Sequence, residues 1–170
     1  MAAGIVAVVL VALLAMLAVL NRRDQIVGLN QEIQYDDFAF SVTGVRKANS
    51  LGSGSSLTKA QGVYYVVTLK VGNHAKRVDY TFKKNSAILV DVEEKEFRPS
   101  IGGQQALEST TGKQCGSPIP AGASCVSEVV FDLPADAEVT HLRISEGGLA
   151  GDILDIVFYG RKRIELGSLQ

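Results

Sequence analysis

The hydrophobic and polar positions divide the chain into an apolar beginning and a long remainder in which apolar and polar residues alternate. Residues 2–20 read AAGIVAVVLVALLAMLAVL and contain no charged side chain. As an α-helix rising about 1.5 Å per residue, this run is about 28 Å long, close to the ~30 Å hydrocarbon core of a bilayer. A buried globular helix is seldom apolar on every face. The pattern therefore predicts a single-pass transmembrane helix.

A cleaved signal peptide is the main alternative for this segment. It requires a basic stretch before the apolar run, an apolar core of about 7–15 residues and a small-residue A-x-A cleavage site. The chain has no basic residue before the run, the run is longer, and no A-x-A triplet closes it. We therefore expect an uncleaved anchor over residues 1–21 and a juxtamembrane linker over residues 22–32.

From about Ile33 onward the apolar positions recur with a period of two, as in half-buried β-strands. Residues 63–73 form the clearest strand. Residues 48–62 and 100–117 are polar, contain several glycines and show no period, so we expect two long loops there. Further alternations predict strands over residues 38–43, 78–82, 88–92, 96–98, 125–133, 142–144, 154–158 and 164–166.

Short strands joined by turns predict an all-β domain over residues 33–166, with residues 167–170 as a tail. An antiparallel β-sandwich is the expected fold, and a closed barrel is the structural alternative. Full burial of one large apolar side chain contributes about 1.5–3 kcal/mol before entropy is counted, so the apolar residues suffice for one core. The expected core residues are Tyr65, Val67, Leu69, Val71, Val129, Phe131, Leu133, Ile156 and Phe158.

Charge and composition exclude some classes of protein. The 170 residues carry 17 Lys and Arg against 18 Asp and Glu, a net charge of −1. Nucleic-acid-binding proteins usually have a basic surplus, so nucleic acid is not an expected partner. Hydrophobic residues make up 46% of the chain. The apolar beginning holds many of them, and the remainder has the composition of an ordinary globular domain.

The cysteine pair bears on the location of the domain. Cys115 and Cys125 flank a segment that contains proline and glycine and can turn back on itself, so we expect a disulfide. Two unrelated thiols are the alternative; a metal or redox role lacks further ligands and a C-x-x-C motif. Disulfides belong to oxidising compartments, which favours an extracytoplasmic domain. Arg22 and Arg23 follow the apolar run and favour the opposite, cytoplasmic orientation, by about one charge.

Three stretches resemble the bacterial DUF4352 family, which includes relatives of small secreted mycobacterial antigens. They are residues 63–73 (VYYVVTLKVGN), 119–134 (IPAGASCVSEVVFDLP) and 140–145 (THLRIS). The resemblance extends over about residues 33–166 and implies an exported immunoglobulin-like sandwich without a known catalytic site. Family members are held by a lipid or a helix, and this chain has no cysteine near its beginning to carry a lipid. The resemblance and the cysteines together favour an extracytoplasmic, periplasmic domain.

Candidate catalytic groups are few. His74 follows a predicted strand end and His141 lies in a short strand, and we expect both to be surface or turn residues. Ser56 and Lys59 fit the S-x-x-K motif of penicillin-recognising enzymes, but the partner motifs S-D-N and K-T-G are absent. We expect no enzyme, no catalytic residue and no cofactor.

Carboxylates gather at predicted strand ends and turns, where solvated acids are usual. Residues 36–37 and 91–96 hold two such groups, and Asp132, Asp136 and Glu138 form a third. The third group is the best calcium candidate, since calcium prefers carboxylate oxygens, but we expect no resident metal.

The expected function is that of a non-enzymatic, membrane-anchored β-sandwich that contacts other proteins. An accessory subunit of a larger membrane complex, such as a respiratory or photosynthetic assembly, is favoured by analogy. An independent surface or periplasmic binding module and a calcium or small-ligand domain are the alternatives. The expected partners are the lipid bilayer and other membrane subunits; no small-molecule substrate is identified. Residues 48–62 and 100–117 are the expected contact surfaces, because long loops on a rigid sandwich often carry function.

Overall fold

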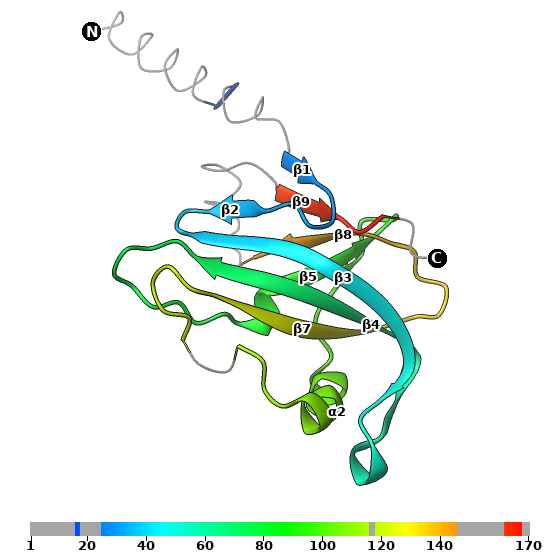
Figure 1. Ribbon diagram of the computed structural model, residues 1–170. Coiled ribbons are helices and arrows are strands. Elements are labelled where there is room, and N and C mark those ends of the chain that lie inside the picture. Colours follow the sequence, from blue (N-terminus) through cyan, green and yellow to red (C-terminus); the bar gives the residue numbers. More distant parts are fainter. Residues whose placement is uncertain (1–15, 18–24, 116–117, 146–161, 168–170) are drawn as a thin grey trace, which may run out of the picture.

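The computed structural model describes residues 16–17, 25–115, 118–145 and 162–167. Among these residues, two β-sheets face each other and one α-helix lies against the outside of one sheet (Figure 1). The strands are β1 (Gln25–Val27), β2 (Ile33–Tyr35), β3 (Phe38–Leu51), β4 (Thr58–Asn73), β5 (Ala87–Asp91), β6 (Glu96–Phe97), β7 (Ser124–Leu133), β8 (Val139–Ile144) and β9 (Lys162–Glu165). The helices are α2 (Ile101–Thr111) and the 3₁₀ turns η1 (Gly54–Ser56) and η2 (Lys84–Ser86).

The strand order confirms a two-sheet sandwich and excludes the closed barrel for the described strands. One sheet has the order β1-β9-β8-β5-β6 and the other has the order β2-β3-β4-β7. Every pairing is antiparallel except that of β1 with β9, which is parallel. Residues 25–27, expected in the linker, thus form an edge strand of the sandwich.

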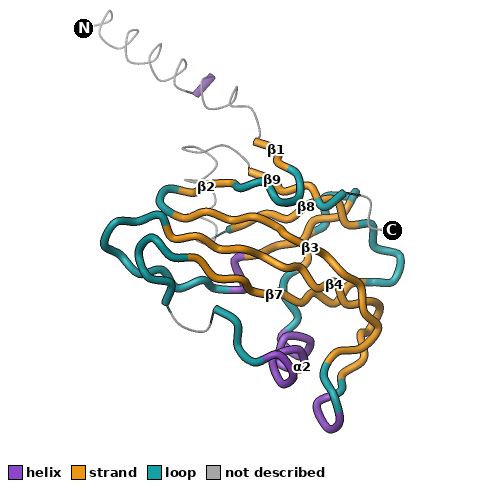
Figure 2. The backbone as a smooth tube through the Cα atoms, in the orientation of Figure 1, coloured by secondary structure: helices purple, strands orange, loops and turns teal. Residues whose placement is uncertain are grey.

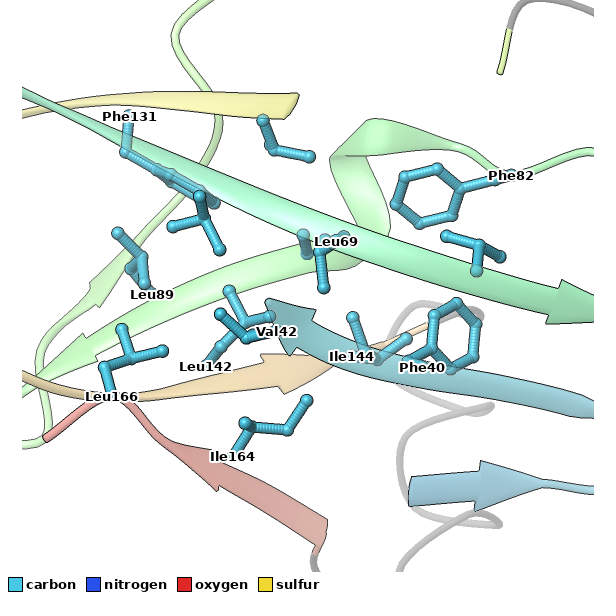
Figure 3. Packing of buried hydrophobic residues seen from close by; sticks show 14 of the residues in the cluster. Phe40, Val42, Leu69, Phe82, Leu89, Phe131, Leu142, Ile144, Ile164 and Leu166 are labelled. Atoms are coloured by element: carbon cyan, nitrogen blue, oxygen red, sulfur yellow. The ribbon is translucent and has the colours of Figure 1, made fainter. Parts of the chain in front are cut away.

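The core lies between the two sheets and is built by alternate residues of the facing strands (Figure 3). Seven of the expected core residues belong to it, each at most 2% exposed, and this confirms which face of β4 and β7 points inward. They are Tyr65, Val67, Leu69, Val71, Val129, Phe131 and Leu133. Ile156 and Phe158 lie outside the described residues.

The predicted anchor over residues 1–21 lies outside the described residues except for Met16 and Leu17, and the predicted strand over 154–158 lies wholly outside them. Among the residues that are described, no helix is long and apolar enough to cross a membrane.

The loop expected over residues 48–62 is mostly β-structure, so that prediction is wrong. β3 and β4 continue as a long hairpin that bends away from the sandwich and closes at η1 (Figure 2). The bend coincides with register shifts between Val42 and Gly44 and between Ala48 and Ser50. Leu51 is the only buried residue between residues 48 and 62, so this ribbon shows no clear alternation of apolar and polar residues, and the pattern could not reveal it.

The loop expected over residues 100–117 contains α2, and this prediction is also wrong. The Ser100 side chain accepts a hydrogen bond from the Gly103 amide and caps the helix at its beginning. Only Gly103, Ala106 and Leu107 of the helix are buried, which leaves too few large apolar residues to show a helical period.

The strand expected over residues 78–82 is likewise not formed. Tyr80 makes one isolated bridge with Ile119. The Asn73 side-chain amide donates to the carbonyl oxygens of Val78 (2.7 Å) and Ile119 (2.9 Å). A side chain therefore holds this segment in place where a neighbouring strand would otherwise do so.

Helix α2 covers the outer face of the β3-β4-β7 layer. Its Ala106 and Leu107 pack with a second set of buried residues, namely Leu51, Tyr64, Val66 and Val130. β4 contributes Tyr64 and Val66 to this layer and its alternate residues to the main core. β4 is therefore buried on both faces.

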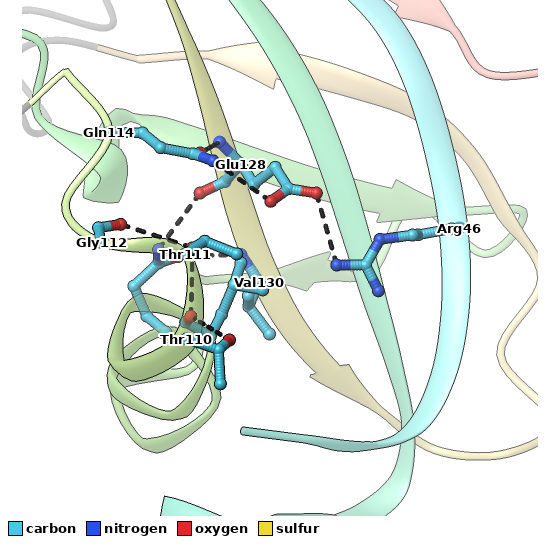
Figure 4. Close-up of polar contacts among 9 residues, drawn as sticks. Arg46, Thr110, Thr111, Gly112, Gln114, Glu128 and Val130 are labelled. Atoms are coloured by element: carbon cyan, nitrogen blue, oxygen red, sulfur yellow. Dashed lines mark hydrogen bonds and ion pairs between the residues drawn. The ribbon is translucent and has the colours of Figure 1, made fainter. Parts of the chain in front are cut away.

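Polar side chains hold the α2 segment along the otherwise open edge of β7. The Gln104 side chain donates to the Glu128 carbonyl (3.2 Å) and accepts from the Val130 amide (3.1 Å), as a neighbouring strand would. The side-chain Oε1 of Gln114 accepts from the backbone N–H of Glu128 at 2.6 Å, and Arg46 pairs with the Glu128 carboxylate at 3.3 Å (Figure 4). These contacts block part of an edge to which another strand could add.

The fit of α2 depends on a glycine and can be tested by substitution. A Cβ atom at Gly103 would lie 2.7 Å from a Val130 methyl carbon and 2.9 Å from the Tyr64 ring. Gly103→Ala is expected to lower the free energy of unfolding by about 1–3 kcal/mol through overpacking. Urea denaturation measures this change.

Gly102 supplies the matched control, because a Cβ atom there meets nothing within 4 Å. Gly102→Ala is expected to raise stability by about 0.5–1 kcal/mol, since alanine favours a helix over glycine. Equal effects of the two substitutions would contradict the close packing of α2 on the sheet.

Candidate functional site

An open groove of about 800 Å³ lies at the end of the sandwich where β7 and β9 stop. Residues from β1, β3, β4, β8 and β9, the β5-β6 turn and the β7-β8 connection line it. A smaller hollow of about 270 Å³ shares Asp91, Val92, Ala137 and Glu138 with the groove. The two hollows therefore form one concave surface across this end.

His141 is a deeply buried residue of the groove lining, 5% exposed. Its Nδ1 lies 3.0 Å from the Thr140 Oγ1, which in turn lies 3.2 Å from the Val90 carbonyl oxygen and 3.3 Å from that of Asp91. A hydroxyl has one proton, and the two carbonyls can only accept. Donation by Thr140 to the carbonyls satisfies all three contacts and assigns the proton of the His141 ring to Nδ1; in this assignment the Nε2 of His141 is an acceptor.

The charge of His141 follows from its surroundings. Burial lowers the pKa of His141, and Arg163 and Arg143 lower it further, while Glu94 and Glu165 act in the opposite direction. The imidazole is therefore neutral at pH 7, consistent with one ring nitrogen donating and the other accepting.

Asp91 shapes the β5-β6 turn rather than offering a free carboxylate. It is 7% exposed, and its Oδ1 accepts hydrogen bonds from the amides of Glu93 (2.9 Å) and Lys95 (2.9 Å). The Val92 amide donates to the Glu138 carbonyl at 3.0 Å. These bonds hold Val92 and Glu94 at the rim of the groove.

The basic side chains of the groove are already engaged. Arg163 pairs with the Glu94 carboxylate at 3.0 Å. The Lys47 ammonium lies 5.2 Å from the centre of the Tyr65 ring, a cation–π contact. The Tyr65 hydroxyl donates to the Ala137 carbonyl (3.2 Å) and fixes the β7-β8 connection against the core.

The structure separates the two histidines, and the expectation for His141 is wrong. His141 is a buried residue of the groove and pairs with Val90 across β5 and β8. Alternation along a short strand does not reveal such burial, so the sequence carried no signal for it. The His74 side chain is 47% exposed, as expected for a turn residue, with its Nε2 4.0 Å from the Glu32 carboxylate.

The third carboxylate group does not assemble into a calcium site. Both Asp132 carboxylate oxygens accept from the Gln61 amide at 3.1 Å, so this carboxylate closes the start of the β4-β7 pairing. Asp136 and Glu138 line the smaller hollow. Among the described residues, no three His, Cys, Asp or Glu side chains lie close enough together to hold a metal ion.

The remaining candidate motifs lie elsewhere. Ser56 and Lys59, the S-x-x-K pair, lie at the tip of the β3-β4 hairpin and at the start of β4. Cys115 and Cys125 form the expected disulfide, with Cα atoms 5.8 Å apart. It ties the segment after α2 to the beginning of β7, one residue from the Gln114 contact with Glu128.

The fold and this end groove define the class as a two-sheet β-sandwich with a groove of mixed polarity and an external helix. Residues 27–152 match the model of a domain of unknown function, DUF4352, and the chain belongs to this family. No curated protein matches the chain.

Several solved structures share the fold. The secreted protein MPT63 from Mycobacterium tuberculosis has a TM-score of 0.56 at 14% identity, with 76% of this chain and 94% of that chain covered. The yjhA protein from Bacillus subtilis has a TM-score of 0.56 at 10% identity, with 82% and 98% covered. An uncharacterised β-sandwich protein from Clostridium difficile has a TM-score of 0.51 at 13% identity, with 85% and 95% covered.

The environment of His141 predicts a pH dependence of stability. Because the pKa of His141 is lowered in the folded state, the unfolded chain takes up this proton first as the pH falls below about 6.5. The wild-type protein is expected to lose stability between pH 7.5 and pH 5.5, and His141→Gln is expected to lose less. Urea unfolding at several pH values measures the difference.

His74→Gln is the matched control, since it removes the exposed histidine. It is expected to keep the wild-type pH dependence. A His141→Gln protein with the same pH dependence as the wild type would contradict the buried, neutral imidazole.

Proposed function

We propose that the protein is an exported, membrane-tethered binding module of immunoglobulin-like type that contacts other membrane proteins, as an accessory subunit of a larger complex. The observation that carries the proposal is the open groove at the end of the sandwich, whose polar lining is held in place by bonds to the backbone. A lining fixed in advance loses little conformational entropy on binding.

The arrangement of Thr140 and His141 favours binding over catalysis. In a hydroxyl–histidine nucleophile pair, the hydroxyl donates to one ring nitrogen and a third group orients the other. With the ring proton assigned to Nδ1, the hydroxyl accepts from the ring and directs its own proton to backbone carbonyls. A lowered pKa also makes His141 a weak base. Both features support a recognition role.

Three observations support an extracytoplasmic position. The disulfide between Cys115 and Cys125 suits an oxidising compartment. MPT63, which shares the fold, is described as secreted. The apolar run over residues 2–20 is long enough to tether such a domain to the membrane. The cytoplasmic orientation favoured by Arg22 and Arg23 is the alternative.

A small-ligand domain is the second candidate, because about 800 Å³ lies within the usual volume range of ligand pockets, about 300–1,000 Å³. The groove is open and mixed in polarity, which suits a segment of a protein better than an enclosed small molecule.

Site-specific photo-crosslinking in intact cells tests the proposed function. Val92 is 58% exposed at the rim of the groove, and a photoreactive residue there is expected to capture a protein partner. The same residue at Lys70, exposed on β4 and outside the groove lining, is the control and is expected to capture less. Mass spectrometry identifies the adducts.

Several outcomes would count against the proposal. Equal adducts at both positions, or none at Val92, would contradict a protein contact at the groove. Adducts only with cytoplasmic proteins would contradict the extracytoplasmic position. Recovery of the extracted protein as a lone monomer, with adducts present, would favour an independent module over a subunit.

A further inference from the structure

We propose that the groove recognises a lysine or arginine side chain in an extended, basic segment of a partner protein. This inference rests on the proposed function and names the chemistry of the partner. The groove offers hydrogen-bond acceptors and a surplus of negative charge, and the partner side chain supplies N–H donors and a positive charge.

His141 distinguishes the groove from a surface that is merely acidic. Its imidazole is almost fully buried, lines the groove and is held at Nδ1 by Thr140. Its Nε2 has no hydrogen-bond partner among the described residues. An acceptor held in the lining of a groove, with no donor among the described residues, suits an incoming N–H group.

The neighbouring groups that remain available are also acceptors. Glu138 and Glu165 line the groove and make no side-chain hydrogen bond or ion pair with the described residues. The guanidinium of Arg163 already donates to Glu94, and the ammonium of Lys47 lies over the Tyr65 ring. The acceptors left open in the groove are therefore the carboxylates of Glu138 and Glu165 and one imidazole nitrogen.

Net charge favours a cation over an anion. Among the described residues, the groove and the adjoining hollow are lined by six carboxylates against three basic side chains, with His141 neutral. The third basic residue, Lys95, lies over the Phe97 ring at 5.2 Å. A cationic side chain would enter a region of net negative charge, whereas an anion would be repelled.

The apolar residues at the rim of the groove favour a basic side chain with a long aliphatic stem. Ile26 (55% exposed) and Val92 (58% exposed) line the groove and can pack against the methylene stem of lysine or arginine. The adjoining hollow, with Glu93 and Asp136, continues the acidic surface along the path of an extended chain. A peptide segment can therefore place a second basic residue there, which a small free amine cannot.

Peptide binding to the full-length protein in detergent micelles tests the inference. The probes are a fluorescent Gly-Arg-Val-Arg-Gly peptide and the same peptide with citrulline in place of arginine, which keeps the shape and removes the charge. The arginine peptide is expected to bind at least about tenfold more tightly, because charge-assisted hydrogen bonds contribute more than neutral ones. Fluorescence anisotropy measures both affinities.

Substitutions in the groove test whether the arginine peptide binds there. Glu138→Gln combined with Glu165→Gln is expected to weaken binding of the arginine peptide about tenfold or more, and His141→Phe is expected to weaken it as well. Asp79→Asn removes an exposed carboxylate that does not line the groove and is expected to change little. Urea denaturation confirms that each variant is folded.

The possible outcomes separate this inference from the proposed function. Equal binding of the two peptides, or unchanged binding to the folded double variant, would overturn the basic-segment inference. If a Val92 adduct with a protein partner still formed in that case, the proposed function would stand. If the arginine peptide bound as expected and no adduct formed, recognition of a basic side chain would stand and the contact with a membrane partner would fail.

Discussion

The burial of β4 on both faces is the constraint on which the rest of the structure depends. Its inward residues fill the core between the sheets, and its outward Tyr64 and Val66 would be exposed to solvent without α2. Leaving two such side chains exposed in the middle of a sheet forfeits about 1.5–3 kcal/mol each. A short helix with few apolar residues can cover them because Gly103 allows close approach and Gln104 bonds to the β7 backbone.

The same strand connects the core to the groove. Tyr65 packs inward from β4, and its hydroxyl holds the β7-β8 connection through the Ala137 carbonyl. Asp91 holds the β5-β6 turn on the opposite side, and Thr140 holds the ring of His141. Each wall of the groove is thus bonded to a strand of the sandwich. Recognition then needs little rearrangement, which is the property expected of a binding module.

The sequence predicted those parts of the structure that bury one face and expose the other. The alternation over residues 63–73 and 125–133 identified β4, β7 and their inward residues, and the spacing of the cysteines predicted the disulfide. The projecting hairpin could not be predicted, since Leu51 is the only buried residue between residues 48 and 62 and one residue sets no apolar period. Helix α2 was missed because it buries one leucine and two small residues, too few for a helical period. His141 was missed because alternation along a short strand does not show that this residue is buried.

The role of the groove depends on the protonation of one ring nitrogen. If Thr140 accepts from Nδ1, the Nε2 of His141 presents a lone pair to the groove, and the lining favours donors. Nitrogen-15 NMR of the imidazole at neutral pH tests this directly. The account predicts a neutral ring with the proton on Nδ1 and none on Nε2. A ring protonated at Nε2 would present a donor to the groove and would contradict the recognition of basic side chains.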